Sequence, residues 1–136
     1  MKYTLHALLF ASAIALAPLA ALACGHCLED RIASVYDHSA VERAKLQKHT
    51  LMYLVWDGPL THDAATRRWL VRTVAAVPGV VAGSVRVSLE PPTIALAFDA
   101  ARTKAAALES ALQGSLAYRG ATASSLPTTT ATAAAP

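Results

Sequence analysis

The sequence predicts an α+β fold in which six segments follow one another as strand, helix, strand, strand, helix and strand. Leu51 to Trp56 is a continuous apolar run, which is typical of a central strand buried on both faces. Residues 84–90 and 94–99 alternate apolar and polar side chains, the period of a half-buried strand. Apolar residues at helical spacing precede and follow this pair of strands.

The first strand is expected to end at Asp57-Gly58-Pro59, and a helix then begins at a capping residue, Thr61 or Asp63. Pro78-Gly79 stops this helix, because proline cannot continue it and glycine adopts the conformation that ends one. Its apolar stripe is expected to face inward and its basic residues outward. These residues are Leu70, Val74 and Val77 inside and Arg67, Arg68 and Arg72 outside.

The second half of the domain repeats the pattern. Pro91-Pro92 makes the turn between the two alternating strands, and Thr103 caps a last helix that Gly114 closes. The inward side chains of this helix are expected to be Leu108, Ala111 and Leu112. Residues 116–122 complete the set as a short edge strand. The order is that of the split βαβ, or ferredoxin-like, βαββαβ sandwich.

An extra helical segment precedes this domain. Leu28, Ile32, Val35 and Tyr36 recur at helical spacing. Residues 37–39 interrupt the pattern, and Ser39 with Glu42 forms a capping box for a second helical piece from Ala40 to about Lys48. A ferredoxin-like sheet carries both helices on one face. We therefore expect the extra segment to cover the outer side of the central strand.

The first 23 residues have the features of a secretory signal peptide. Lys2 is followed by the apolar run Leu5 to Ala17, and residues 21–23 are the small-residue cleavage site Ala-Leu-Ala. The run is shorter than the roughly 20 residues that span a membrane, so an uncleaved anchor is the minor alternative. Cleavage makes Cys24 the first residue of a periplasmic or secreted protein. A cysteine here also resembles a lipoprotein box, and an acylated Cys24 is the one case in which we expect membrane attachment.

The mature chain divides into a segment at 24–48, a domain at 49–122 and a tail at 123–136. The tail is rich in Thr, Ala and Pro and low in charge, so we expect it to be disordered. The 12 Lys and Arg residues against 9 Asp and Glu give a formal net charge of +3. This balance is too mild to indicate a nucleic-acid partner. Enzyme signatures such as GxSxG, HExxH or a phosphate loop are also absent, which favours a binding module.

The domain resembles a known family at its core positions. These positions are Val77-Pro78-Gly79-Val80, residues 84–89, residues 94–99 with Thr103, and Leu112-Gln113-Gly114. They are similar to the stretches that mark the heavy-metal-associated domain, the fold of copper chaperones. The resemblance implies a ferredoxin-like fold and a soft metal held by Cys-x-x-Cys in the loop after the first strand. Residues 57–63 form that loop here and contain no cysteine, so no ligand is carried over from the family.

Both cysteines of the chain lie in Cys24-Gly25-His26-Cys27. Two thiolates and an imidazole can bind one soft ion, copper first and zinc second. A free amino terminus at Cys24 adds a square-planar Cu(II) site with His26 at the third position. The same cysteines could instead act in thiol–disulfide exchange, helped by the positive end of the following helix, or form a plain disulfide. We therefore predict an exported metal-binding protein, with a redox protein and a non-metal interaction domain as alternatives.

Two further expectations concern the place of this site. The tight connection at 47–49 predicts that the extra helical segment runs antiparallel to the first strand. Its amino-terminal end would then lie near the 57–63 loop, where Cys24 and Cys27 could replace the missing family cysteines; a bend at 37–39 would direct it elsewhere. In the loop itself, His62 with Asp57 and Asp63 is a weak candidate for a harder ligand set, and a solvated turn explains these residues equally well. A periplasmic protein is the expected partner for metal transfer.

Overall fold

The structure is a computed structural model that describes residues 23–127. The expected signal peptide, apart from Ala23, and residues 128–136 of the expected tail lie outside the described residues. The elements in chain order are α1 (Ala23–Ser34), α2 (His38–Leu46), β1 (Thr50–Asp57), α3 (Ala64–Ala75), β2 (Arg86–Leu89), β3 (Pro92–Phe98), α4 (Ala105–Ala117) and β4 (Thr122–Ser125). From β1 onward the order is βαββαβ, so the expected ferredoxin-like fold is confirmed.

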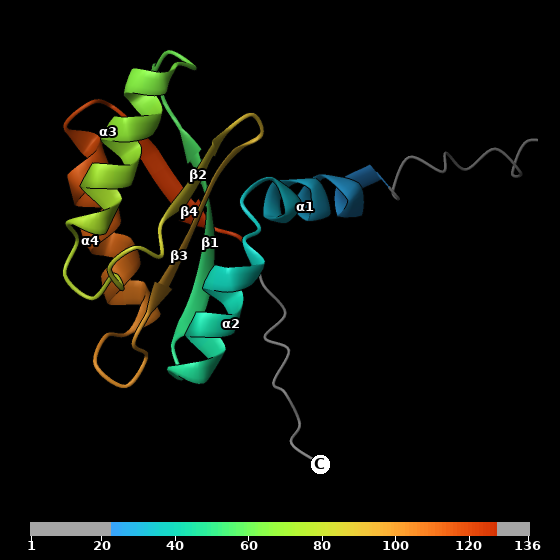
Figure 1. Ribbon diagram of the computed structural model, residues 1–136. Helices are drawn as coiled ribbons and strands as arrows, with labels where there is room; N and C mark the ends of the chain where they lie inside the picture. Colours follow the sequence, from blue (N-terminus) through green and yellow to red (C-terminus); the bar gives the residue numbers. More distant parts are fainter. Residues whose placement is uncertain (1–22, 128–136) are drawn as a thin grey trace, which may run out of the picture.

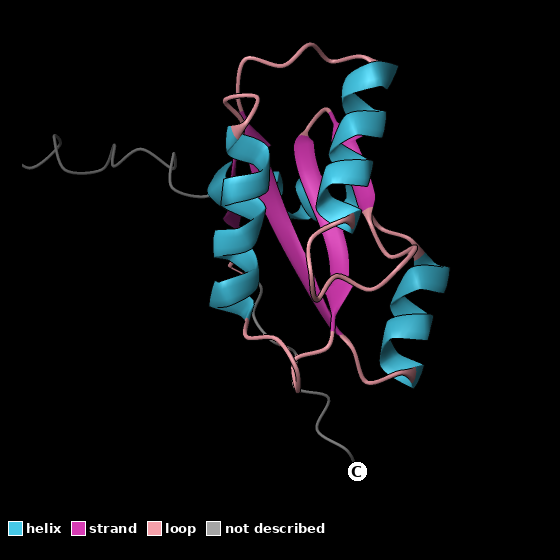
Figure 2. Cartoon of the chain, turned by 90° about the vertical axis from the view of Figure 1, so that its left-hand side faces the viewer, coloured by secondary structure: helices cyan, strands magenta, loops and turns pink. Residues whose placement is uncertain are grey.

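The strands form one antiparallel sheet in the order β2-β3-β1-β4, so β1 is central as expected. Figure 1 shows α3 and α4 on one face of this sheet and α1 and α2 on the other. Figure 2 shows α3 and α4 side by side in front of the strands. The extra helical segment therefore packs on the face that a ferredoxin-like sheet otherwise leaves open.

The main core lies between the sheet and the pair α3 and α4. Alternate residues of β1 and β3 point into it, because side chains along a strand alternate between the two faces. The largest fully buried side chains there are Leu54, Trp56, Leu70, Val74, Ile94, Leu96, Leu108, Leu112 and Leu116. The indole of Trp56 also donates a hydrogen bond to the carbonyl oxygen of Ser88 at 3.0 Å. The expected inward stripe of α3 is confirmed, with Leu70, Val74 and Val77 buried.

The opposite face of the sheet is covered mainly at β3. Thr93, Ala95 and Ala97 point to this face and are all buried. Their side chains are small, which allows α1 and α2 to approach the backbone of the strand. On β1, by contrast, the residues of this face are only half-buried. The expectation that β1 is fully buried on both faces is thus wrong, since Leu51, Tyr53 and Val55 stay half-buried although α2 packs against β1.

Three element boundaries differ from those expected. Asp37 rather than Ser39 caps α2, since its carboxylate accepts the Ala40 backbone N–H at 3.1 Å. Helix α4 continues through Gly114 to Ala117, because Leu116 is fully buried and its packing outweighs the cost of an internal glycine. Ala111, which was expected to face inward, is exposed. Lys104 rather than Thr103 precedes this helix.

The last strand also lies further along the chain than expected. Residues 116–122 were the expected strand, and 122 the expected end of the domain, but β4 occupies Thr122–Ser125. The backbone N–H of Leu126 still donates to the Tyr53 carbonyl oxygen at 2.8 Å, and Glu109 of α4 accepts the Ser125 N–H at 3.0 Å. Residues 123–126 therefore belong to the domain, because β1 offers them an unpaired edge. In the part of the chain from 23 to 127, no helix is long and apolar enough to cross a membrane.

Replacement of a core leucine tests the role of the α3 packing. We expect Leu70→Ala to lower the free energy of unfolding by about 2–5 kcal/mol, because it removes buried methyl groups and leaves a cavity. Leu46→Ala makes the same chemical change at a side chain that is 82% exposed, and it should stay within about 0.5 kcal/mol of the wild type. Urea denaturation followed by circular dichroism measures both. Equal losses in the two variants would contradict the assigned core.

Candidate functional site

The cysteine motif lies at the start of α1, whose helical backbone begins at Ala23. Positions 24 and 27 are three residues apart in this helix, so they are neighbours on its surface. Position 26 lies between them in the same turn. For residues 23–27 the structure describes the backbone alone, so what it gives for Cys24, His26 and Cys27 is their place in the first turns of α1.

The carboxyl-terminal half of α1 is attached to the sheet near the start of β3. Val35, which follows the helix, is 5% exposed, and α1 packs against β3. Arg31 donates from its guanidinium to the Pro92 carbonyl oxygen at 3.4 Å. Thr93 of β3 pairs with Val55 of β1, and Pro92 is the next residue of β3 toward the end of β1. The attachment therefore lies at the end of the sheet where β1 terminates.

Asp37 fixes the junction between α1 and α2. Its backbone is extended, with φ −134° and ψ 107°, so the helix cannot continue through it. One carboxylate oxygen accepts the Ser39 hydroxyl at 2.7 Å and the Ala40 N–H. The other accepts the Arg86 Nε–H at 2.8 Å and forms an ion pair with Arg86 Nη2 at 2.8 Å. These bonds, from Ser39 first, then Arg86 and Ala40, hold the pKa of the Asp37 carboxyl well below its usual range. The junction is thereby bound to β2.

The bend at Asp37 changes where the motif lies. A helical segment antiparallel to β1 was expected to bring the motif to the 57–63 loop unless a bend at 37–39 directed it elsewhere. In the structure α2 alone precedes β1, and α1 leaves the junction in a different direction (Figure 1). The amino-terminal end of α1 lies at the outside of the molecule in Figure 1. The predicted interruption at 37–39 is confirmed, because α1 ends at Ser34 and α2 begins at His38.

The polar side chains of the 57–63 loop support the turn. Asp63 caps α3, accepting the Thr66 N–H at 2.7 Å and the Thr61 hydroxyl at 2.8 Å. Asp57 accepts the N–H of Gly58 at 2.8 Å. The His62 ring contacts the Trp56 indole edge to face, with centroids 5.6 Å apart. Each of these groups already has a structural partner.

Gly58 shows how closely this loop packs. Its φ is +150°, and a Cβ atom there would lie 2.8 Å from the Ala121 Cα. Only glycine fits between the loop and the chain that leads into β4.

Among the side chains that the structure describes, no three His, Cys, Asp or Glu residues come together in a way that could hold a metal ion. The harder ligand set expected from His62, Asp57 and Asp63 is therefore not formed.

Sequence reasoning missed Arg86, the side chain that binds the helix junction. Arg86 was expected only as a polar residue on the wet face of its strand. Its partner lies 49 positions earlier in the chain, and no local pattern marks such a pair. Ser88 lies on the same face of β2 as Arg86, which was expected to be exposed to solvent, but Ser88 is buried.

Comparison with known proteins adds similar structures. No protein-family model matches this chain, and neither does any curated protein. Oxidized MerP from Ralstonia metallidurans CH34 is similar at 22% identity over 57% of this chain and 96% of that chain, with a TM-score of 0.44. A copper binding domain from HMA7, a P-type ATPase, has 18% identity over 56% of this chain and 92% of that chain, with a TM-score of 0.44. The CopZ metallochaperone has 15% identity over 55% of this chain and all of that chain, with a TM-score of 0.42.

These three structures are heavy-metal-associated domain proteins, the family whose core positions the sequence resembles. The likeness is one of fold and does not extend to a loop Cys-x-x-Cys. The names of these three structures do not identify a binding site in this chain.

Acid titration tests the Asp37 junction. A carboxyl whose pKa is lower in the folded than in the unfolded state stabilises the fold above its unfolded pKa of about 4, and this contribution is lost as the pH falls through the folded value. We expect Asp37→Asn to be less stable than wild type at pH 7 and to lose less of its remaining stability below about pH 4. Urea denaturation at a series of pH values measures both effects.

The matched control is Glu29→Gln, which removes one exposed carboxylate from α1. The free energy of unfolding of Glu29→Gln should fall below about pH 4 by the same amount as that of the wild type. Identical pH curves for Asp37→Asn and wild type would show that the carboxylate does not hold the junction.

Proposed function

We propose that this chain is an exported protein that binds a soft metal ion, copper first and zinc second, through Cys24, His26 and Cys27. The observation that carries this is the placement of the motif. Both cysteines of the sequence and one histidine fall within four consecutive residues, and α1 gives that segment a helical backbone.

The chemistry of the motif favours such an ion. Soft thiolate ligands select Cu(I) and Zn(II), and imidazole accepts both. A metal bound at about 2.3 Å from each sulfur requires two cysteines on neighbouring positions, which a spacing of three in a helix provides. The start of a helix also carries partial positive charge, which favours the thiolate that a metal requires.

The position of α1 suits transfer of the ion to a partner. A delivery site must be reached by a second protein, and the amino-terminal end of α1 lies at the outside of the molecule (Figure 1). The sandwich from β1 to β4 then serves as the body that carries the site. The partner class is a periplasmic protein that offers competing soft ligands.

The ligand class is the one named for two of the similar structures, a copper binding domain and a metallochaperone. The proposed location differs from the loop after the first strand, because residues 57–63 contain no cysteine here. A thiol–disulfide role for the same cysteines is the alternative, and the experiment below separates the two.

Competition titration tests the metal site. The reduced exported protein should withdraw Cu(I) from a chromophoric chelator in a 1:1 ratio. We expect Cys24→Ser and Cys27→Ser each to weaken the affinity by about 100-fold or more, because each removes a thiolate ligand, and His26→Gln to weaken it less. His62→Gln is the control and should leave the affinity unchanged.

Equal affinity in wild type and both serine variants would exclude the site. A measurable dithiol reduction potential without any metal uptake would instead support the redox alternative. Circular dichroism of each variant shows that the fold is intact.

Intact mass spectrometry tests export. We expect the protein recovered from the periplasm to begin at Cys24 and to carry no added mass, since residues 21–23 satisfy the signal peptidase. A diacylglyceryl mass on Cys24 would place the protein on a membrane and remove that thiol. A mass that includes Met1 would contradict cleavage altogether.

A further inference from the structure

The free edge of β4 is closed by two side chains of α4. β4 is the last strand in the order β2-β3-β1-β4, so one of its edges has no neighbouring strand. The Gln113 side-chain amide donates to the Ala123 carbonyl oxygen and accepts the Ala123 N–H at 3.4 Å. The Glu109 carboxylate accepts the Ser125 N–H at 3.0 Å and the Ser125 hydroxyl at 3.1 Å. The side chains thus bind the backbone of β4 from outside the sheet.

The bound groups are those that a further strand would use. Successive residues of an antiparallel strand direct their N–H and C=O groups alternately to its two sides. The Leu126 N–H donates to β1 at Tyr53, so Ser124 and the other even-numbered residues of β4 face β1. Ala123 and Ser125 therefore direct their backbone groups away from the sheet. These are the two residues that Gln113 and Glu109 bind.

Helix α4 holds the two side chains at the spacing that the edge requires. Glu109 and Gln113 are four residues apart, so they lie on one face of the helix. Leu108 and Leu112, their neighbours in the chain, are fully buried and fix the helix against the sheet. The Gln113 amide carries both a donor and an acceptor, so it can bind Ala123 as the backbone of a neighbouring strand would.

The residues of β4 give this edge no other protection. Natural edge strands are usually protected by charged side chains, prolines or bulges. Thr122 to Ser125 contain neither a charged residue nor a proline, and their pairing with β1 is continuous, without a bulge. β2, the strand at the other edge of the sheet, carries Arg86. Protection of the β4 edge therefore depends on α4.

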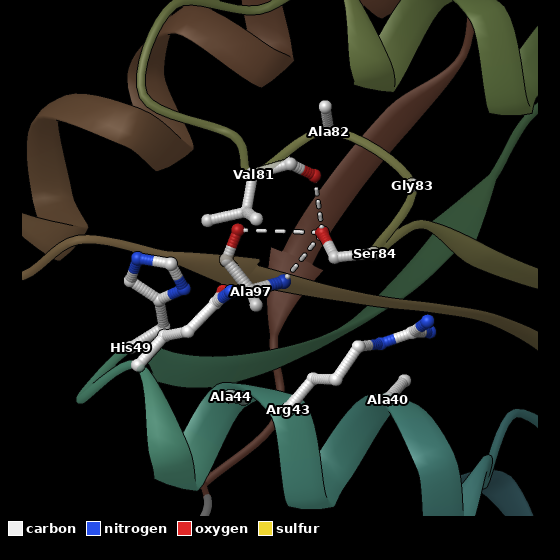
Figure 3. Close-up of a pocket in the computed structure, with 10 residues that line it drawn as sticks. Ala40, Arg43, Ala44, His49, Val81, Ala82, Gly83, Ser84 and Ala97 are labelled. Carbon is white, nitrogen blue, oxygen red and sulfur yellow. Dashed lines mark hydrogen bonds between the residues drawn. The ribbon is translucent and has the colours of Figure 1, made fainter.

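The chain closes an edge of β3 in a similar way. β2 pairs with β3 only from Pro92 to Ala95, and the segment 81–84 continues along β3 beyond it. The Val81 N–H donates to the Ala97 carbonyl oxygen at 2.8 Å, and the Ser84 hydroxyl accepts the Ala97 N–H at 3.0 Å (Figure 3). Ala97 thus has partners for both of its backbone groups, as Ala123 has from Gln113.

We propose that Glu109 and Gln113 form a latch that keeps the chain monomeric, because it prevents β4 from pairing with β4 of a second copy. Two copies of one strand edge present the same spacing of N–H and C=O groups, so they can pair antiparallel about a twofold axis. The latch competes with this pairing because its bonds are intramolecular and require no loss of translational freedom. The latch lies on α4 and does not depend on the proposed metal site of α1.

Amide hydrogen exchange of the exported protein, resolved by residue in dilute solution, tests the bonds of the latch. In the double variant Glu109→Ala/Gln113→Ala, the Ala123 and Ser125 amides should exchange about fivefold or more faster, since each loses its acceptor. The Leu126 amide, which donates to β1, is the internal reference and should change little. An equal acceleration at Leu126 would show that the side chains hold the whole strand, and it would overturn the proposal.

Size-exclusion chromatography with light scattering tests the oligomeric state. Over about a hundredfold range of concentration, the wild type should keep the mass of a monomer and the double variant should approach that of a dimer. Glu29→Ala/Gln47→Ala is the matched control, because it removes the same two side-chain types from exposed positions of α1 and α2. This control should stay monomeric.

A charge on the strand identifies the surface through which the copies associate. Ser124→Lys, added to the double variant, should restore the monomer, because like charges would meet across the paired edges. A double variant that stays monomeric at every concentration would overturn the proposal, and so would a dimer that persists with Ser124→Lys. If circular dichroism shows that the double variant is unfolded, Glu109→Ala alone should accelerate exchange at Ser125. Unchanged exchange there would overturn the latch.

Discussion

The Asp37 carboxylate is the interaction on which the amino-terminal half of the structure depends. It caps α2 and binds Arg86 of β2, both through its two oxygens. Without it, α2 would lose its cap and the junction its bond to the sheet. Buried Val35 and the bond from Arg31 to the Pro92 carbonyl oxygen hold α1 on the sheet beside this junction. These contacts together couple the proposed metal-binding segment to the sandwich.

The outer face of the sheet explains why an extra segment is present. A ferredoxin-like sheet with helices on one face leaves the other open, and here β3 presents Thr93, Ala95 and Ala97 on that side. These side chains are small, so α1 and α2 can pack closely against the strand. Ala97 also lines a cavity beside Arg43 and His49.

Periodicity in the sequence was sufficient to predict the order of the strands and helices, because alternation and helical spacing are local properties. It also identified Asp63 as one of two caps for α3, and the structure confirms it. It failed where tertiary contacts decide. Buried Leu116 carries α4 past Gly114, and Asp37 acts as the cap in place of Ser39 because it also reaches Arg86. The interruption at 37–39 was predictable from the local pattern, but the bond that ties it to β2 was not, since Arg86 lies 49 positions along the chain.

The core of the sandwich is built without the candidate metal ligands. This core is apolar and contains a fully buried tryptophan, six fully buried leucines and an isoleucine, among them Trp56, Leu70 and Ile94. In small metal-dependent domains, by contrast, the ligands hold together a chain that has too little core, and metal binding is coupled to folding. Here the candidate ligands lie on α1, outside the β1–β4 sandwich. At the proposed site an ion would therefore bind and leave without contact to the core of the sandwich, which is the property that a carrier of metal ions requires.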